Sequence, residues 1–256
     1  MRIRASSSQR VTALRAINGR LLVGTFENGL FEYDGADFSR DFQRVAGPTA
    51  KCVTAILDEG PRVFVGTFDH GAAIARGGRF ERLAAVTATE TVNAIAWDGQ
   101  GDAARLWLGT AHGLVRVDPG GATRRFSSHD GLPSSLVRSL LVLPDGKVVA
   151  GTEEGAAIVD GERVRPILAT KKGAPRDLAS PMHATWAIAR GEDGTLFLGT
   201  ATGLYWGKDA RWSRAALATG ELEDDWVTAL AVSGSDVWVG TYSKGVTRMR
   251  FGAGRP

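Results

Sequence analysis

The amino-acid sequence predicts an all-β fold, a six-bladed β-propeller, from three observations. An apolar triplet followed by Gly-Thr recurs six times, at intervals of 41 to 48 residues. Dipeptides such as Asn-Gly and Asp-Gly, which favour hairpin turns, divide the intervals into short segments. The 33 glycines among 256 residues are about twice the usual ~7% share, without the every-third spacing of collagen. Repeats of about 40 to 50 residues that contain several short strands are typical of β-propellers.

Each repeat has the same internal order. An apolar segment is followed by a turn and by the Gly-Thr segment, and a short loop ending in glycine then leads to a third and a fourth segment. We therefore expect four antiparallel strands per blade. The inner strands of the blades should start near residues 11, 53, 92, 137, 185 and 227. The six repeats occupy the whole sequence, so we expect a single domain over residues 1–256.

The segments at the front of each repeat are apolar at nearly every position. A half-exposed strand would alternate apolar and polar residues, so these strands need cover on both faces, which the stacking of blades provides. We expect the bulky position two residues before the repeated glycine to fill the space between blades. That position holds Leu22, Phe64, Trp107, Val149, Phe197 and Trp238.

The two ends of the chain predict how the ring closes. The sixth repeat stops after its third strand, whereas residues 1–4 precede the first inner strand. We expect this N-terminal strand to complete the last blade, which would remove an open sheet edge.

The repeats resemble a known type of blade. Residues 105–118 (RLWLGTAHGLVRVD), 131–161 (GLPSSLVRSLLVLPDGKVVAGTEEGAAIVDG) and 194–206 (GTLFLGTATGLYW) are similar to two-component regulator propeller repeats. The resemblance extends through all six repeats. It implies a bacterial sensor-type β-propeller, of the kind found as an extracytoplasmic module in hybrid histidine kinases. The 256 residues contain no histidine kinase box and no second propeller, so we infer no signalling output.

Composition and charge exclude several classes of protein. A net charge of +3, from 31 basic and 28 acidic residues without a basic stripe, argues against nucleic-acid binding. The single Cys52 excludes an internal disulfide and a cysteine-ligated zinc site. No apolar run reaches the ~18 residues of a membrane span. We expect no cofactor and a soluble protein, cytoplasmic if the sequence is complete and periplasmic or extracellular if a leader was removed.

One face of the propeller is predicted to hold the site. In an up-and-down blade, the loop between the second and third strands lies on the same rim as the linkers between blades. Three of these loops are one residue longer than the others and begin with an aromatic residue, and blades 6, 1 and 2 would be neighbours in a closed ring. The three loops are Tyr242-Ser243-Lys244, Phe26-Glu27-Asn28 and Phe68-Asp69-His70. An arc of aromatic rings with polar neighbours suits sugar or peptide recognition, and the alternative is that the rings pack on the rim.

Two tryptophans and two linkers belong to the same face. Trp186 and Trp226 stand at the start of inner strands, near the channel mouth, where they either plug the channel or stack on a ligand. The linker 167–184 includes Lys171, Lys172 and Arg176, and the linker 216–225 is acidic. These linkers either pair loosely with each other or form a lip that docks a protein.

The sequence thus predicts a non-catalytic recognition module that binds a small molecule, such as a glycan or peptide, or a protein partner. The alternative is a hydrolase or lyase at the channel mouth, possibly metal-dependent. Its candidate groups are His70, His112, Asp69 and Glu153. The sequence contains no Gly-x-Ser-x-Gly elbow and no phosphate-binding glycine loop before a helix, so we expect no catalytic residues.

Overall fold

The fold is the predicted six-bladed β-propeller. The computed structural model describes residues 10–34, 43–45, 47, 50–76, 79–99, 104–169, 184–208 and 211–251. Within these residues the regular elements are β-strands and short 3-10 helices, without an α-helix. The strands form six separate antiparallel sheets, which are the six blades. By its contacts the chain divides into two compact units, residues 1–125 and 126–256, and each is described by itself.

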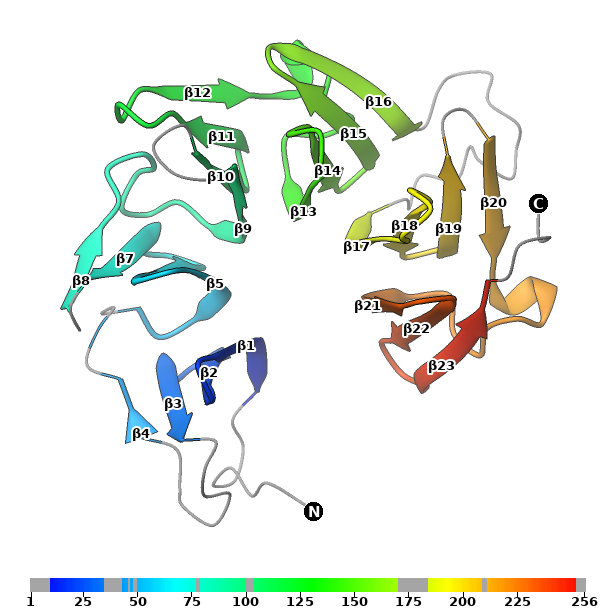
Figure 1. Ribbon diagram of the computed structural model, residues 1–256, viewed down its shortest axis with the longest axis horizontal. Helices are drawn as coiled ribbons and strands as arrows, with labels where there is room; N and C mark the ends of the chain where they lie inside the picture. The colour runs from blue at the N-terminus through cyan, green and yellow to red at the C-terminus, as the bar shows by residue number, and fades with distance from the viewer. Residues whose placement is uncertain are drawn as a thin grey trace. The chain divides into compact units, whose positions relative to one another are not determined.

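The first unit contains three four-stranded sheets whose strands pair in chain order (Figure 1). Blade 1 consists of β1 (Val11–Ile17), β2 (Arg20–Thr25), β3 (Leu30–Asp34) and β4 (Gln43–Arg44). Blade 2 consists of β5 (Val53–Glu59), β6 (Arg62–Thr67), β7 (Ala72–Arg76) and β8 (Arg79–Arg82). Blade 3 consists of β9 (Val92–Asp98), β10 (Arg105–Thr110), β11 (Gly113–Val117) and β12 (Thr123–Phe126). The strand β5 contacts both β1 and β9, so the first strands of successive blades pack together.

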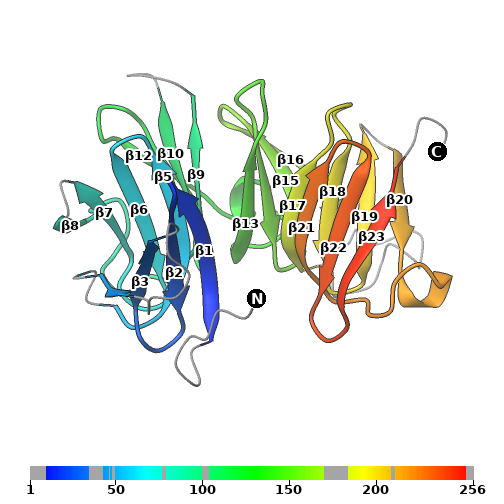
Figure 2. The same cartoon turned by 60° about the horizontal axis from the view of Figure 1, so that its bottom comes forward.

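The second unit repeats this arrangement (Figure 2). Blade 4 consists of β13 (Val137–Val142), β14 (Val148–Thr152), β15 (Gly155–Asp160) and β16 (Arg163–Ala169). Blade 5 consists of β17 (Thr185–Arg190), β18 (Leu196–Thr200), β19 (Gly203–Lys208) and β20 (Arg211–Ala215). Blade 6 consists of β21 (Val227–Ser233), β22 (Asp236–Thr241) and β23 (Gly245–Arg250), and the 3-10 helices are η2 (Ser128–Asp130) and η3 (Leu217–Thr219). The strand β17 contacts both β13 and β21.

Blade 6 has three strands among the described residues, with β23 at its edge. The segment expected to supply its fourth strand, residues 1–4, lies outside the described residues, as do Lys171, Lys172 and Arg176 of the linker after blade 4. Closure of the ring by the N-terminal strand therefore stays a prediction.

The threonine of each Gly-Thr pair closes the short loop that follows it. In all six blades its hydroxyl donates a hydrogen bond of 2.8 to 3.3 Å to the carbonyl of the glycine that ends the loop. The same hydroxyl accepts a backbone N–H from within the loop. Five of the six threonines are buried, so the bonds are shielded from water. The Gly-Thr pair recurs in the sequence because the threonine hydroxyl makes these loop-closing hydrogen bonds in every blade.

The glycine of the pair allows neighbouring blades to approach closely. A Cβ atom on Gly24 would lie 2.7 Å from Cγ1 of Val53, and one on Gly199 would lie 2.6 Å from Cγ1 of Val227. Both valines begin the first strand of the following blade. A side chain at either glycine would push two blades apart.

Five of the six residues expected between blades are buried: Leu22, Phe64, Trp107, Val149 and Phe197. Trp238 differs, because 42% of its surface is exposed. Its strand β22 alternates, with Val237 and Val239 buried in the cluster that includes Phe197 of blade 5. Within the described part of the second unit no strand covers the opposite face of blade 6, which is the face that Trp238 occupies.

Candidate functional site

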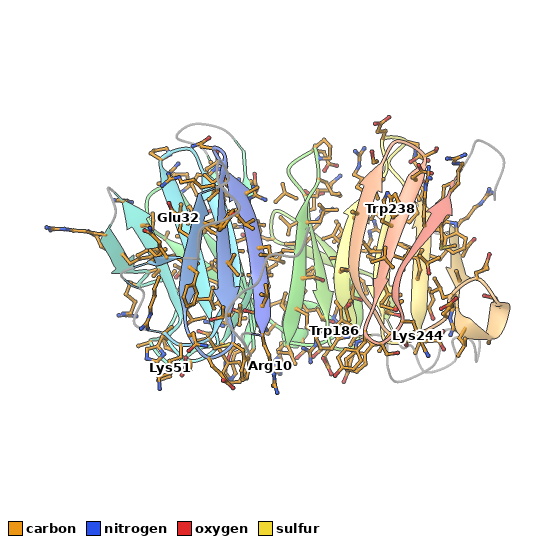
Figure 3. The ribbon with its side chains drawn as sticks, turned by 90° about the horizontal axis from the view of Figure 1, so that it is seen from below. Arg10, Glu32, Lys51, Trp186, Trp238 and Lys244 are labelled. Atoms are coloured by element: carbon orange, nitrogen blue, oxygen red, sulfur yellow. The ribbon has the colours of Figure 1, made fainter. Side chains whose placement is uncertain are left out.

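The short loop of each blade lies beside the start of that blade's first strand. In five blades the residue after the threonine donates its backbone N–H to the carbonyl of the residue that precedes the first strand, at 2.9 to 3.1 Å. The pairs are Phe26 with Arg10, Phe68 with Cys52, Ala111 with Thr91, Glu153 with Leu136, and Tyr242 with Trp226. We call the end of the blades that carries these loops the short-loop face. Figure 3 shows Arg10 and Lys51 at this end of the first unit, and Trp186 and Lys244 at this end of the second.

In blade 6 both members of the pair are aromatic, and they begin a longer series. The rings of Trp226 and Tyr242 stack, with centroids 4.3 Å apart and planes 19° apart. Trp186, the second residue of β17, lies 5.6 Å from Trp226 at 55°. Arg138, the second residue of β13, places its guanidinium 4.0 Å from the centre of Trp186. These four side chains come from blades 4, 5 and 6, and we call them the aromatic row.

A carboxylate at each end fixes the aromatic row. Nε of Arg138 donates to Oε2 of Glu153, which orients the guanidinium over Trp186. At the other end, Asp224 accepts the Trp226 amide at 2.9 Å, the Ser243 amide at 2.9 Å and the Ser243 hydroxyl at 2.7 Å. These hydrogen bonds, led by that from the Trp226 amide, hold the pKa of Asp224 below its ordinary value. Asp224 is therefore ionised at neutral pH and joins the linker to the loop that carries Tyr242.

Two polar atoms of the aromatic row lack partners. The indole Nε1 atoms of Trp186 and Trp226 are buried, and neither has a hydrogen-bond acceptor among the described residues. A buried donor left unsatisfied costs about 1–3 kcal/mol, so such donors are rare in well-packed interiors. Tyr242, in contrast, is 69% exposed. The row thus combines an open ring with two buried indole N–H groups that have no acceptor among the described residues.

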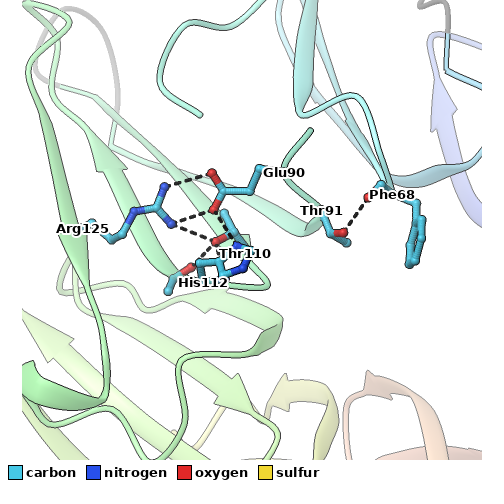
Figure 4. A network of polar contacts seen from close by, with 7 residues as sticks. Phe68, Glu90, Thr91, Thr110, His112 and Arg125 are labelled. Carbon is cyan, nitrogen blue, oxygen red and sulfur yellow. Dashed lines mark hydrogen bonds and ion pairs between the residues drawn. The ribbon is translucent and has the colours of Figure 1, made fainter. Parts of the chain in front are cut away.

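A second polar cluster lies on the short-loop face of the first unit (Figure 4). Arg125 of β12 forms two hydrogen bonds with Glu90, at 2.7 and 3.0 Å, and a third with the hydroxyl of Thr110 at 3.1 Å. Nδ1 of His112 lies 3.8 Å from Oε1 of Glu90. Burial raises the pKa of Glu90, but the hydrogen bonds from Arg125 and Thr110 lower it by more, so the pKa lies below its ordinary value. The pair ties the linker before β9 to the outer strand of the blade.

The aromatic residues expected in blades 1 and 2 are exposed on the same face of the first unit. The guanidinium of Arg10 lies 6.0 Å from the centre of the Phe26 ring. The carbonyl of Phe68 accepts the Thr91 hydroxyl at 2.5 Å. Phe26 and Phe68 share no ring contact within the described residues. The arc that would join them to Tyr242 involves both units and stays a prediction, as does any ligand-binding role of Glu27, Asn28 and Lys244.

The groups expected for a metal-dependent enzyme each have another neighbour. Nδ1 of His70 contacts Oδ1 of Asp69 at 2.7 Å, His112 lies beside Glu90, and Glu153 pairs with Arg138. In the part of the chain that the structure describes, no three histidine, cysteine, aspartate or glutamate side chains gather in a way that could hold a metal ion.

Sequence reasoning missed Arg138, Glu90 and Arg125. It placed Asp224 in the acidic linker but did not foresee its hydrogen bonds to Trp226 and Ser243. A signal for Arg138 was present, because it follows the first residue of β13 just as Trp186 follows the first residue of β17. Equivalent positions of adjacent blades are neighbours, so the alignment of repeats predicts their contact. The pairing of Glu90 with Arg125 has no such signal, since it joins a linker to a fourth strand 35 residues later.

No family model and no curated protein matches the sequence. Solved structures share its fold. The extracellular domains of BT4673 and BT3049 from B. thetaiotaomicron, both ascribed to hybrid two-component systems, are similar with TM-scores of 0.57 and 0.73 at 17% and 16% identity. They match over 97% and 95% of this chain and 39% and 34% of their own. An ancestral GH74 enzyme has a TM-score of 0.73 at 15% identity, over 96% of this chain and 37% of the enzyme.

This chain therefore spans about two fifths or less of the length of these neighbours. Extracellular domains of two-component systems and an enzyme are both among them, so the likeness shows the propeller fold alone. No helix within the described ranges is long and apolar enough to cross a membrane.

Proposed function

We propose that this chain is a non-catalytic recognition propeller of the two-component regulator type, which binds its ligand or partner through the aromatic row. The exposed Tyr242 ring, stacked on Trp226, is the observation on which the proposal rests. A fixed aromatic ring provides contact area at little entropic cost, because it is already held in place before binding. Extracellular sensor domains among the structural neighbours support a sensing role, and we extend their extracytoplasmic location to this chain as part of the proposal.

Packing alone accounts poorly for the aromatic row. A plug would bury its rings and satisfy its donors, whereas Tyr242 is exposed and the Trp186 and Trp226 indole N–H groups have no acceptor within the described residues. The row is also held by polar groups, Glu153 and Asp224, that a purely apolar plug would not need. Supporting a surface ring from several sides is what a binding site requires.

The alternative, a hydrolase or lyase, lacks a comparable arrangement. Its candidate groups His70, His112 and Glu153 make separate contacts, with Asp69, Glu90 and Arg138 respectively. A general acid or base needs a reacting atom within hydrogen-bond reach of it and of its partner group. No described observation favours such a site over the aromatic row.

The test is a binding screen with matched variants. Arrays of oligosaccharides and of peptides are probed with the wild-type protein, with Tyr242→Ala and with Trp238→Ala, a control that removes another exposed ring of the same unit. We expect at least one array member to bind, about tenfold more weakly to Tyr242→Ala and unchanged to Trp238→Ala. Binding that survives in Tyr242→Ala, or the absence of any bound member, would contradict the proposal.

A further inference from the structure

We propose that the open face of Tyr242 binds a guanidinium or ammonium group of a basic peptide segment. This inference rests on the recognition function proposed above and specifies the chemistry of the partner. Three properties of the described residues lead to it: a cation already occupies the equivalent place at the other end of the aromatic row, the linker bonded to the Tyr242 loop through Asp224 is acidic, and the ring is accessible.

The first property is an internal precedent. The guanidinium of Arg138 lies 4.0 Å from the centre of Trp186 while its Nε donates to Glu153. The cation is thus held by an aromatic face and a carboxylate together, which is the usual geometry for binding such a group. The chain supplies the cation itself at Trp186. At Tyr242 the ring is present and Asp224 is bonded to the adjacent Ser243, but no cation of the described residues lies over the ring.

The second property is local charge. The linker beside Tyr242 carries Glu221, Glu223, Asp224 and Asp225, and Lys244 is the one cation in the adjoining loop. Asp224 and Asp225 accept backbone N–H groups, so their role is to shape the linker. Glu221 and Glu223 are exposed, and although Glu221 accepts the Thr219 hydroxyl at 3.1 Å, both contribute negative charge to this surface. A basic segment gains from this charge, whereas a neutral sugar does not.

The third property is access. One face of the Tyr242 ring covers Trp226 at 4.3 Å, and 69% of the residue remains exposed. The hydrogen bonds of Ser243 to Asp224 hold the adjacent backbone in place. A flat guanidinium can therefore stack on the outer face without displacing the loop, which limits the entropic cost of docking.

The experiment measures fluorescence anisotropy of a labelled Gly-Arg repeat peptide, with a matched peptide in which citrulline replaces arginine. Citrulline keeps the shape of arginine and removes its charge. The proteins are wild type, Tyr242→Ala, Tyr242→Phe, the double variant Glu221→Gln with Glu223→Gln, and the control Trp238→Ala. The control is matched because Trp238 is an exposed ring with Arg248 5.4 Å from its centre, outside the aromatic row.

We expect the arginine peptide to bind and the citrulline peptide not to bind. Tyr242→Ala should weaken binding about tenfold, and Tyr242→Phe less than about threefold, because the ring face is retained. The double glutamine variant should weaken binding about three- to tenfold and reduce its dependence on salt. Trp238→Ala should bind as wild type does. Because Tyr242 is exposed, its variants should melt at the wild-type temperature, which separates lost binding from misfolding.

Three results would overturn the inference. Equal binding of the citrulline peptide would show that charge is not recognised, and unchanged binding by Tyr242→Ala would place the site elsewhere. Self-association of the wild type that Tyr242→Ala abolishes would identify a second copy of the chain as the occupant. If an array sugar binds in a Tyr242-dependent way while the arginine peptide does not, the recognition function stands and this inference alone fails.

Discussion

In each blade the threonine hydroxyl of the repeated Gly-Thr pair holds a loop of the short-loop face in its conformation. Thr67 is buried, donates to the Gly71 carbonyl at 2.8 Å and accepts the His70 N–H at 3.0 Å. The position after this threonine holds the aromatic residues of the longer loops, Phe26, Phe68 and Tyr242. The threonine at the end of each second strand therefore determines the position of the candidate binding residue that follows it.

Replacing Thr67 with valine should show how much the threonine hydroxyl contributes to the free energy of unfolding. Valine keeps the shape and removes the hydroxyl, which takes the acceptor from the partly buried His70 N–H and a donor from the Gly71 carbonyl, so we expect a loss of about 1–3 kcal/mol in the free energy of unfolding. Urea denaturation measures the loss. The matched control is Thr241→Val, whose bond is longer at 3.3 Å and more exposed, and which should cost less than about 1 kcal/mol. Equal losses in the two variants would contradict this account.

At the scale of elements, linkers and outer strands are joined by polar pairs as well as by apolar packing. Glu90, in the linker between β8 and β9, is buried and receives three of its contacts from Arg125, Thr110 and His112. The backbone of the same linker also accepts the Gly71 N–H at 3.0 Å. A charge in this position is tolerated only while its partner is present.

Removing Arg125 should therefore destabilise blade 3 in a pH-dependent way. The folded pKa of Glu90 is lowered, so its pairing contributes stability at pH values above the unfolded pKa near 4.5 and loses it as the pH falls through the folded pKa. In Arg125→Met the carboxyl is buried without its cation. We expect the free energy of unfolding to fall by about 2 kcal/mol near pH 7, which is less than for a fully buried pair because Arg125 is partly exposed. At about pH 4 the fall in the free energy of unfolding should be smaller.

Urea unfolding of wild type and Arg125→Met at both pH values gives the two differences. Arg79→Met, which removes an exposed arginine of β8, is the control and should change neither value. A loss of the same size at both pH values would show that Glu90 is not the titrating group.

At the scale of the whole molecule, burial differs between the middle and the ends of the chain. The Gly-Thr strand of blade 5, which has blades 4 and 6 on its two sides within the second unit, is buried throughout. The outermost blades in the sequence expose large apolar residues, with Val11 and Leu14 on β1 and Val246 on β23. Large exposed apolar groups mark surfaces that another contact covers. The ring closure expected from the sequence would provide such a contact.

Deletion of residues 1–5 tests that closure. If the N-terminal strand completes blade 6 beside β23, its loss opens a sheet edge, and we expect the melting temperature to fall by several degrees. Differential scanning calorimetry measures the change. Deletion of residues 252–256, which follow β23, is the control and should leave the melting temperature unchanged. A wild-type melting curve for the N-terminal deletion would refute closure by this strand.

Most of the fold could be predicted because its signals are local and repeated. The turn at Asn18 and Gly19 forms as expected, with φ values of 47° and 78° that match the hairpin type favoured by Asn-Gly. The burial of Phe64 and Trp107 follows from the repeat alone. The exposure of Trp238 does not follow from the repeat, which buries the equivalent residue of the other five blades.

The site could be predicted only in part. Trp186, Trp226 and Tyr242 were each expected on the short-loop face. The two tryptophans were expected either to plug the channel or to stack on a ligand, and Tyr242 was expected in an arc with Phe26 and Phe68. Their stacking on one another depends on ring orientations, and Arg138 joins them from a third blade. Side-chain geometry of this kind is set by packing between segments that are distant in the chain.

The sequence by itself determined the strand order, the turns and the loops of the short-loop face. Glycine, threonine and the apolar periodicity act through backbone geometry within a single repeat, so each repeat carries these signals. Only the tertiary structure decided which side chains of that face meet. The Arg138–Trp186 contact, the Trp226–Tyr242 stack and the burial of Glu90 against Arg125 arise between blades or between strand and linker. Their energies depend on distances of a few ångströms that no local pattern encodes.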